Sequence, residues 1–294
     1  MSRRTEPDRS GKVMVITGAN TGIGKETAVA LAAMGATVVM TARTRAKGEE
    51  ALAEVRRRSG SEIVELGDLD LSSFASIRAF AAWMLDRHDR IDVLVNNAGL
   101  ITDTRRETAE GFEEMFGVNH LGHFLLTELL CERLVASAPA RVVVLSSVAH
   151  RFALGGLSRT DLQGTHSFQG FSAYSQSKLA NALFGMELAR RLDGTGVTVN
   201  CVHPGAINSH FGGDGDTGAL GRFIKVTGRF ILRSPKTGAK TSVLMASSRH
   251  PRIAGTTGGY FSHGRKWPAS RRARSTEEAS WLWDESVRLV AEVS

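Results

Sequence analysis

Cysteine is scarce in this sequence, and its scarcity excludes two kinds of small, cross-linked fold. The 294 residues contain only Cys131 and Cys201, which lie far apart in the chain. Neither the close cysteine pairs of a zinc site nor a disulfide framework is present. The sequence also lacks a two-histidine helical motif with a neighbouring acid, so we expect no metal site. Two isolated thiols are typical of a reducing compartment, and we expect a cytoplasmic protein.

Long hydrophobic runs are missing as well. Although Arg3 and Arg4 resemble the start of a twin-arginine export signal, only Val13–Ile16 is continuously apolar before Thr17. We therefore expect neither a signal peptide nor a transmembrane span. With 42% hydrophobic and 23% charged residues, the composition is that of a folded globular protein. Glycine outnumbers proline by 31 to 6, which favours tight turns and close backbone contacts.

Short apolar runs alternate with amphipathic stretches of helical length along most of the chain. Buried strands are expected at 13–16, 37–40, 93–95, 142–145 and 197–199, with weaker candidates at 62–65 and 259–262. Helices are expected at 24–34, 46–58, 73–85, 111–136, 172–192 and 237–248, and from residue 276 onward. This rhythm predicts an α/β fold, a single doubly wound parallel sheet with helices on both faces. Without a repeat or linker, we expect a flexible leader over 1–11 and one domain over 12–294.

A glycine-rich turn follows the first expected strand and leads directly into a helical run. The turn consists of small or polar residues with one isoleucine: Gly18, Asn20, Thr21, Gly22, Ile23 and Gly24. Glycines let the backbone approach a pyrophosphate, whose charge meets the free N–H groups and the positive end of the helix dipole. The pattern alone is weak, but its position in a βαβ unit predicts a dinucleotide site.

Arg43 follows the second strand, where a site for NAD usually has an acidic residue that binds the ribose 2′-hydroxyl. No acid occurs between Glu26 and Glu49. The Arg43 guanidinium offers a 2′-phosphate a planar fork of donors. We therefore expect NADP(H), with NAD(H) as the alternative if Arg43 is an ordinary exposed arginine.

Tyr174 and Lys178 are four residues apart and share one face of an expected helix. A phenol, whose ordinary pKa is about 10, is a poor acid or base at neutral pH. A neighbouring ammonium lowers that pKa by favouring the phenolate, and an oxidised nicotinamide would add a second positive charge. Such pairs are usually surface residues, but here Ser147 ends a strand and Asn119 lies on the preceding long helix. The four residues form a candidate catalytic set.

Together these features resemble the short-chain dehydrogenase/reductase family, in its Rossmann-type subgroup with a Thr-Gly-x-x-x-Gly-x-Gly turn. The resemblance extends from about Lys12 to the C-terminus, and its motifs occur in the family's order: Thr17–Gly24, Asn96–Gly99, Asn119, Ser147, Tyr174 with Lys178, and Pro204–Gly205. Gly117–Thr127 and Leu69–Ser73 are similar to the retinol-dehydrogenase-like branch. The resemblance therefore implies a single Rossmann-type oxidoreductase domain.

The resemblance also implies a role for each candidate residue. Tyr174 would exchange a proton with the substrate oxygen, and Lys178 would lower its pKa and bind the nicotinamide ribose. Ser147, rather than Ser146, would orient the substrate oxygen, and Asn119 would hold a water that links Lys178 to solvent. The further cofactor contacts that it implies are Asp70 and Leu71 at the adenine, Asn97, Ala98 and Gly99 at the adenine ribose, and Pro204, Gly205 and Ile207 at the nicotinamide carboxamide.

Two positions depart from the family's pattern. Ser147 and Tyr174 are about twice as far apart as is usual in the family, so residues 151–171 must form an extra excursion beside the active site. Ser209 replaces the threonine that many members carry after Pro-Gly, and its hydroxyl would still be able to bond the carboxamide.

His120 and His123 flank Asn119 in the sequence. A proton-shuttling role is open to either residue. Histidines packed for structural reasons are commoner, and we expect that role for both.

The stretch between Pro204 and Ser234 contains seven glycines, which is typical of a mobile loop. Apolar residues such as Phe223 and Phe230 share one face of a helix expected over 220–232, and basic residues occupy the other face. We expect this segment, about 206–234, to form a lid that closes over an apolar pocket. Peripheral contact with an anionic membrane surface is the alternative.

A second basic cluster surrounds Trp267 and consists of Arg265, Lys266, Arg271, Arg272 and Arg274. The net charge of +7 is compatible with nucleic acid, an anionic membrane or a phosphate-bearing ligand. Solvated loop charges explain the cluster most simply, with an acidic substrate as an alternative. The lack of a recognised binding motif and an aromatic content of 6% disfavour nucleic acid.

The resemblance and the expected apolar lid predict an NADP(H)-dependent oxidoreductase that interconverts an alcohol with an aldehyde or ketone on a lipophilic small molecule. A catalytically silent, dinucleotide-binding regulatory protein is the alternative. Asn119, Ser147, Tyr174 and Lys178 favour the enzyme, because a sensor needs the glycine turn but not the phenol. The sequence is compatible with a homo-oligomer and does not identify the substrate.

Overall fold

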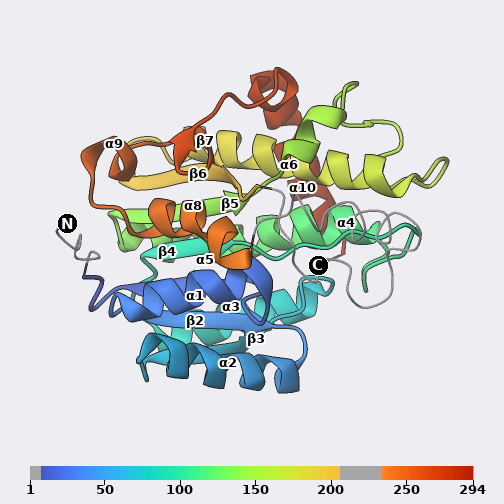
Figure 1. The fold of residues 1–294 in the computed structure, drawn as a ribbon. Helices are drawn as coiled ribbons and strands as arrows, with labels where there is room; N and C mark the ends of the chain where they lie inside the picture. Colours follow the sequence, from blue (N-terminus) through green and yellow to red (C-terminus); the bar gives the residue numbers. More distant parts are fainter. Residues whose placement is uncertain (1–7, 206–233, 294) are drawn as a thin grey trace.

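The computed structural model describes residues 8–205 and 234–293. Eight strands within these ranges form one sheet in the order β3-β2-β1-β4-β5-β6-β7-β8 (Figure 1). Neighbouring strands are parallel except at the edge, where β8 is antiparallel to β7. The strands are β1 Val13–Ile16, β2 Thr37–Ala42, β3 Val64–Asp68, β4 Val93–Asn96, β5 Ala140–Leu145, β6 Val197–His203, β7 Gly259–Ser262 and β8 Arg265–Lys266.

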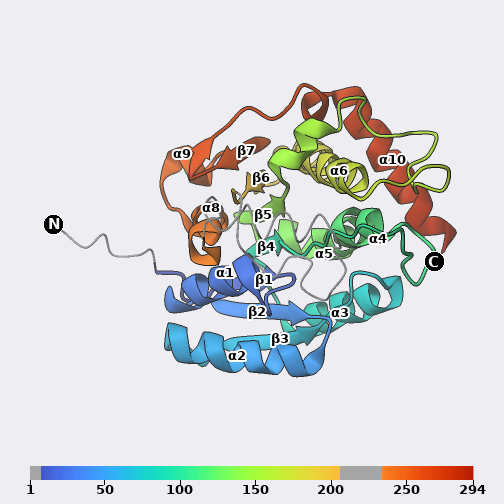
Figure 2. The ribbon, with the colours of Figure 1, turned by 45° about the vertical axis from the view of Figure 1, so that its right-hand side comes forward.

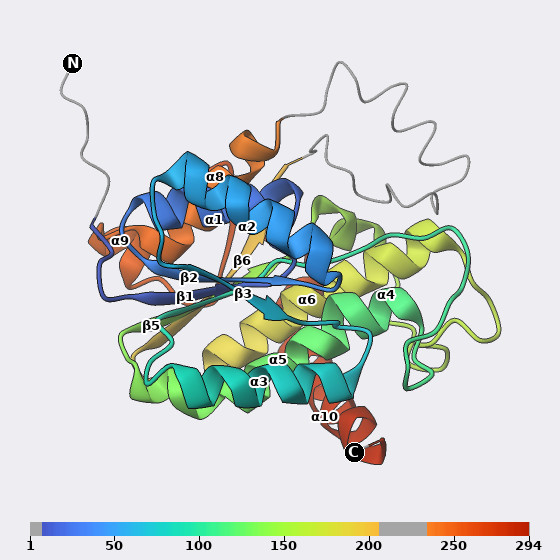
Figure 3. The ribbon, with the colours of Figure 1, turned by 90° about the horizontal axis from the view of Figure 1, so that it is seen from below.

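Helices cover both faces of the sheet (Figure 3). One layer contains α1, α2 and α8, and the opposite layer contains α3, α5 and α6, with α10 outside α6 (Figure 2). The α-helices are α1 Gly22–Ala33, α2 Arg45–Ser59, α3 Phe74–Arg87, α4 Glu114–Phe116, α5 Gly122–Ala136, α6 Gly170–Arg191, α8 Pro235–Ser247, α9 Pro251–Ala254 and α10 Thr276–Glu292. The predicted doubly wound α/β sheet is confirmed.

Alternate residues of each strand enter two separate cores, because successive side chains of a strand point to opposite faces. Met14 and Ile16 belong to the core under α1, α2 and α8. Val13 and Val15 belong to the core under α3, α5 and α6. Since both faces are covered, the strands are nearly continuous apolar runs in the sequence.

Helix α10 extends the second core outward. Its Trp283 packs edge-on against Phe124 of α5, with ring centroids 5.0 Å apart, and stacks on Phe184 of α6 at 6.0 Å. The Arg191 guanidinium lies 4.3 Å from the centre of the Trp283 ring. The helix begins after Ser275, whose hydroxyl accepts the Glu278 N–H as an N-cap.

The single helix expected over 111–136 is interrupted. The Glu113 carboxylate accepts the N–H groups of Met115 and Phe116, at 2.9 and 2.7 Å, and so caps the short α4. A π-helical turn, Gly117–Leu121, then separates α4 from α5. Hydrophobic periodicity does not distinguish this arrangement from one continuous helix. The antiparallel strand β8 was not expected either, because two exposed basic residues carry no apolar signal.

Four residues of the expected leader, 8–11, are described. The Arg9 N–H donates to the Met34 carbonyl at 2.7 Å, and its guanidinium donates to the Ser247 carbonyl. These residues therefore lie against α1 and α8. The expected lid, including Ile207 and Ser209, lies outside the described residues. Among the helices that are described, none has the length and apolarity needed to cross a membrane.

Candidate active site

The candidate site lies at the carboxyl ends of β1 and β4, which are neighbours in the sheet. After β1 the chain continues to β2 on one side, and after β4 it continues to β5 on the other side. Thr17 follows β1, and its buried hydroxyl accepts the N–H groups of Asn97 and Ala98 at 2.8 and 2.9 Å. The Asn97 side-chain amide donates to the Thr17 carbonyl at 2.7 Å. Thr17 therefore joins the glycine-rich turn to the segment after β4.

The glycine-rich turn leaves no room for a side chain at Gly18 or Gly24. Gly18 has a φ of 61°, and a Cβ on it would lie 2.9 Å from the Ala98 Cβ. A Cβ on Gly24 would lie 2.5 Å from both the Gly18 carbonyl and the Asn97 side chain. Asn20 and Ile23 are half-buried in and after the turn.

The start of α1 suits an anionic group. Thr21 precedes the helix without capping it through its side chain, Gly22 is its first residue, and the first turn contains no acid. Unpaired N–H groups at a helix N-terminus attract negative charge. Together with the close backbone packing at Gly18 and Gly24, this end of α1 fits the pyrophosphate of a dinucleotide.

The other expected cofactor contacts lie along the same edge of the sheet. Arg43 is exposed between the end of β2 and the start of α2. The Asp70 carboxylate accepts the N–H and hydroxyl of Ser72 at 2.9 and 2.6 Å, which shapes the loop after β3. Leu71 is buried beneath α5, where a Cβ on Gly122 would come within 2.7 Å of its carbonyl. Gly205, which follows Pro204 after β6, has a φ of 94°.

Ser147, Tyr174 and Lys178 come together between the end of β5 and helix α6. The Ser147 side chain forms a hydrogen bond with the Tyr174 side chain. The Lys178 ammonium lies 5.6 Å from the centre of the Tyr174 ring. Ser146 instead donates to the Lys178 carbonyl at 2.8 Å, which ties α6 to the end of β5. Ser147 is thus the serine of the pair that contacts Tyr174.

Asn119 lies in the π-helical turn and is fully buried. Its side-chain oxygen accepts the Leu100 N–H at 2.8 Å, and its amide donates to the Leu100 carbonyl and the Ser177 hydroxyl, both at 3.0 Å. A Cβ on Gly99 would lie 3.0 Å from the Lys178 ammonium and 3.1 Å from the Asn119 oxygen. The absent side chain at Gly99 therefore leaves room for both groups.

Burial governs the proton affinities of the catalytic pair. Burial raises the pKa of Tyr174 to about 12, and the hydrogen bond from Ser147 opposes the rise. Burial also lowers the pKa of the Lys178 ammonium to about 8. The hydrogen bond with Ser147 lowers the pKa of Tyr174, and a further lowering by Lys178 stays a prediction.

His123 joins the glycine-rich turn to the π-helical turn. Its Nε2 lies 2.8 Å from the Thr17 hydroxyl, and its Nδ1 lies 3.1 Å from the Asn119 carbonyl. Because the Thr17 oxygen already accepts two N–H groups, its proton points to Nε2, and Nδ1–H then donates to Asn119. Burial lowers the pKa of His123 to about 4 and that of His120 to about 3. Both are neutral structural histidines, as expected.

The structure adds His150 and Tyr260, which the sequence analysis did not single out. The His150 Nδ1 lies 2.5 Å from the Ser147 carbonyl, and its Nε2 accepts the Ser270 N–H at 3.0 Å. The Tyr260 hydroxyl lies 3.3 Å from the same ring. No local motif marks this contact, because Ser270 is 120 positions from His150.

The expected excursion, residues 151–171, packs beside the catalytic residues. The Ser158 N–H donates to the side chain of Gln176, two positions after Tyr174, at 2.8 Å. Phe152 and Phe171 are 61% and 36% exposed, and their ring centroids lie 5.5 Å apart. Phe171 precedes Tyr174 by one turn of α6, so an apolar surface adjoins the candidate catalytic residues.

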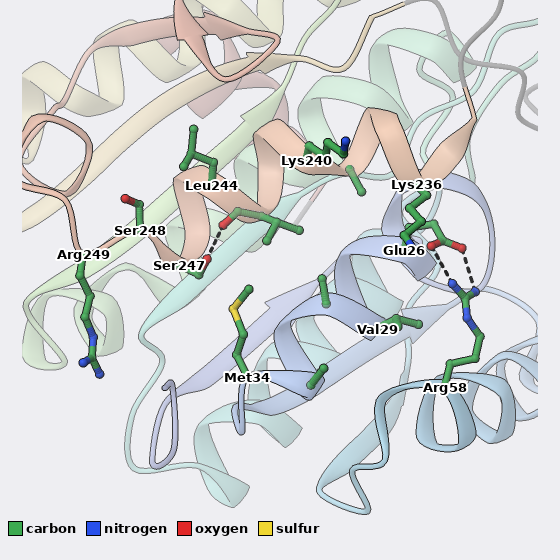
Figure 4. Close-up of a pocket in the computed structure, with 14 residues that line it drawn as sticks. Glu26, Val29, Met34, Arg58, Lys236, Lys240, Leu244, Ser247, Ser248 and Arg249 are labelled. Atoms are coloured by element: carbon green, nitrogen blue, oxygen red, sulfur yellow. Dashed lines mark hydrogen bonds and ion pairs between the residues drawn. The ribbon is translucent and has the colours of Figure 1, made fainter. Parts of the chain in front are cut away.

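A separate apolar groove of about 760 Å³ lies between α1 and α8 (Figure 4). Val29, Met34 and Leu244 line it, and the ion pair between Glu26 and Arg58, at 2.7 Å, closes one end. The groove lies on the face of the sheet opposite α6, and no catalytic candidate lines it. It is therefore not the active site. Within 8–205 and 234–293, no group of three or more potential metal ligands occurs.

Comparisons with known proteins agree with this geometry. A profile of the family described as short chain dehydrogenase matches residues 12–159 and 160–216. The chain is 45% identical over 287 residues to retinol dehydrogenase 12 of Homo sapiens, covering 98% of this chain and 89% of that protein. An uncharacterized protein from Mycobacterium paratuberculosis has a crystal structure with a TM-score of 0.76 and 35% identity, covering 98% of this chain and 96% of that one. An NADP active-site complex of Pseudomonas aeruginosa RhlG has a TM-score of 0.67 and 26% identity, covering 87% and 95%.

Proposed function

This chain belongs to the short-chain dehydrogenase family, and on that premise we propose that it interconverts an alcohol and a carbonyl group on a lipophilic small molecule, with NADP(H) as cofactor. Its membership makes it an oxidoreductase that acts on CH–OH groups. The observation that carries the proposal is the meeting of Ser147, Tyr174 and Lys178 beside an exposed apolar surface.

Tyr174 is proposed to move the proton. With a pKa of about 12 its hydroxyl carries its proton at neutral pH but is a weak acid, so donation of that proton to a carbonyl oxygen would need the neighbouring positive charge of Lys178. Ser147, hydrogen-bonded to Tyr174, would hold that oxygen in place. The Lys178 ammonium would stabilise the phenolate that remains. NADP(H), when bound, supplies or accepts the hydride.

Two features support NADP(H) over NAD(H). Arg43 follows β2, and no acid occurs between Glu26 and Glu49 to bind a 2′-hydroxyl. A guanidinium gains charge-assisted bonds only with the cofactor that carries a 2′-phosphate. RhlG, which shares the fold, has been solved in an NADP complex.

The proposed lipophilic substrate follows from the surface around the catalytic residues. Phe152 and Phe171 are exposed apolar side chains of the excursion, and their rings contact each other. Exposed apolar surface of this kind marks binding sites more often than random surface does. Retinol dehydrogenase 12, an identified relative, is named for a lipophilic alcohol.

The test is a turnover assay with NADPH or NADP⁺ and a panel of long-chain and short-chain aldehydes, ketones and alcohols. Tyr174→Phe should lower kcat by about 10²- to 10⁴-fold, because only the transferable proton is removed. Affinity for NADPH should remain within a few-fold of the wild type. Lys178→Ala should damage both turnover and cofactor affinity.

The chain offers a matched control in its other tyrosine, Tyr260, which is 2% exposed. Tyr260→Phe makes the same chemical change at a hydroxyl that contacts His150, behind Ser147, so it should lower turnover much less than Tyr174→Phe does. Equal turnover in Tyr174→Phe and wild type would rule out Tyr174 as the proton donor. Cofactor binding without turnover of any panel compound would favour the silent regulatory protein instead.

A further inference from the structure

Four arginines from two distant segments line one cavity of about 830 Å³ beside the active site. Arg151 belongs to the segment that follows Ser147, whereas the other three arginines precede α10. The charged and apolar residues of its lining are Arg151, Arg271, Arg272, Arg274, Ala153 and Leu154. No aspartate or glutamate is among the described residues that line it.

The positive charge of this cavity is not neutralised by ion pairs within the described ranges. Arginines elsewhere bind carboxylates, as in the contacts formed by Arg45, Arg58, Arg87, Arg90, Arg105, Arg190, Arg191 and Arg288. The acids closest in sequence to the cavity, Glu277 and Glu278, are engaged otherwise. Glu277 pairs with Arg159 at 3.3 Å, and Glu278 accepts the Leu157 N–H at 2.6 Å. Both line a neighbouring cavity, which shares Arg272 and Ser275 with the arginine cavity.

The walls of the cavity are held in place by contacts between its two segments. The Arg151 guanidinium lies 5.0 Å from the centre of the Trp267 ring and donates to the Pro268 carbonyl. Its Nε is buried and has no hydrogen-bond partner, which leaves one donor unused. On the far wall, the Ser270 N–H donates to His150, whose other ring nitrogen contacts the Ser147 carbonyl. The cavity is thus two hydrogen bonds from the catalytic serine.

We propose that this cavity binds the phosphate group of a small amphiphilic molecule. Guanidinium forks match the oxygens of phosphate and carboxylate, and four of them provide more charge than a single carboxylate would neutralise. The volume exceeds that of a free oxyanion, and Leu154, 81% exposed, and Ala153 provide an apolar wall for the remainder of the ligand. The site is distinct from the proposed 2′-phosphate contact at Arg43, which lies beyond β2 on the other side of β1. Binding here does not depend on the proposed reaction.

The probe is n-dodecyl phosphate below its micelle concentration, titrated calorimetrically into the full-length protein. We expect saturable binding that weakens with added salt. Arg272→Ala with Arg274→Ala should weaken it at least tenfold. Arg288→Ala is the matched control, because Arg288 is also exposed but pairs with Glu285 and Glu292, and it should bind as the wild type does. Thermal unfolding checks that each variant is folded.

Three outcomes would overturn the proposal. These are equal affinity in the wild type and the double variant, equal affinity for n-dodecylphosphocholine, and loss of binding in Arg43→Ala but not in the double variant. Sedimentation with vesicles identifies the source of the phosphate. Binding to phosphatidic acid vesicles, but not to phosphatidylcholine vesicles, points to a lipid headgroup, whereas binding of dodecyl phosphate without sedimentation points to a soluble phosphate ester.

Discussion

Two halves of the molecule position their functional residues in different ways. In the cofactor half, residues 8–136, Thr17 and Asn97 lie at the ends of neighbouring parallel strands and bind each other directly. In the substrate half, the described residues from 140 onward, His150 contacts Ser270 and Arg151 contacts Trp267 across more than 100 positions of the chain. The first half takes its geometry from the sheet, and the second takes it from loops that meet beyond the sheet.

This difference has a physical cause. Parallel strands carry their carboxyl ends to one edge, so a motif directly after a strand has its position fixed by topology. An excursion such as 151–171 is positioned only by the side-chain contacts that it makes. Substitutions should therefore act through backbone geometry in the cofactor half and through individual contacts in the substrate half.

The largest effect on stability is expected when alanine replaces a crowded glycine of the cofactor half, and the comparison is an open glycine of the substrate half. Gly24→Ala would place a Cβ 2.5 Å from the Gly18 carbonyl, so we expect a loss of about 1–3 kcal/mol in stability and a loss of dinucleotide binding. Gly155 has no atom within 4 Å of the same Cβ and lies in the excursion. Gly155→Ala should change stability by less than about 0.5 kcal/mol. Urea unfolding measures the stability of each variant, and NADPH titration measures its cofactor affinity. Equal effects of Gly24→Ala and Gly155→Ala would contradict the proposed difference between the two halves.

The sequence predicted the strands and the long helices of both halves, but not the contacts that join distant loops. Strand runs and the glycine-rich turn are local patterns, so β1, β2 and the turn residues followed from periodicity and spacing. The π-helical turn that contains Asn119 did not, because hydrophobic periodicity does not distinguish it from a continuous α-helix. The cavity at Arg151 depends on a contact with Trp267 that no spacing rule contains.

The second prediction concerns cofactor affinity, which should depend on Arg43 in the cofactor half. Arg43→Ala should raise the Kd for NADPH about 10- to 100-fold and leave the Kd for NADH unchanged, because only NADPH has the 2′-phosphate. Arg45→Ala is the matched control, since Arg45 pairs with Glu49 at 2.8 Å. Fluorescence titration with both cofactors gives the four constants. Equal affinity of the wild type for NADPH and NADH would contradict the assignment.

Phe171→Ala provides the reciprocal measurement in the substrate half. Phe171 contacts Phe152 and lies one turn of α6 before Tyr174, so we expect both cofactor affinities to be unchanged. The KM for long-chain carbonyl compounds should rise, because part of an exposed apolar surface is removed. The KM for short polar compounds should stay the same. A change in NADPH affinity comparable to that of Arg43→Ala would show that the halves are not separable.

The smallest effect concerns pH and compares two histidines. Burial lowers the pKa of His123 from 6.5 to about 4. Between these two pH values the His123 side chain is mostly protonated in the unfolded chain and mostly neutral in the folded chain. Through this residue, lowering the pH from 7.5 to 5.5 should therefore reduce the free energy of unfolding by about 1.4 kcal/mol. His123→Asn destabilises at every pH by removing the bond to Thr17, but it should flatten the pH dependence by that amount. His120→Asn should flatten the pH dependence in the same way, because burial lowers the pKa of His120 to about 3. Urea unfolding at the two pH values measures the slopes, and an unchanged slope in His123→Asn would show that His123 accepts a proton in the folded protein.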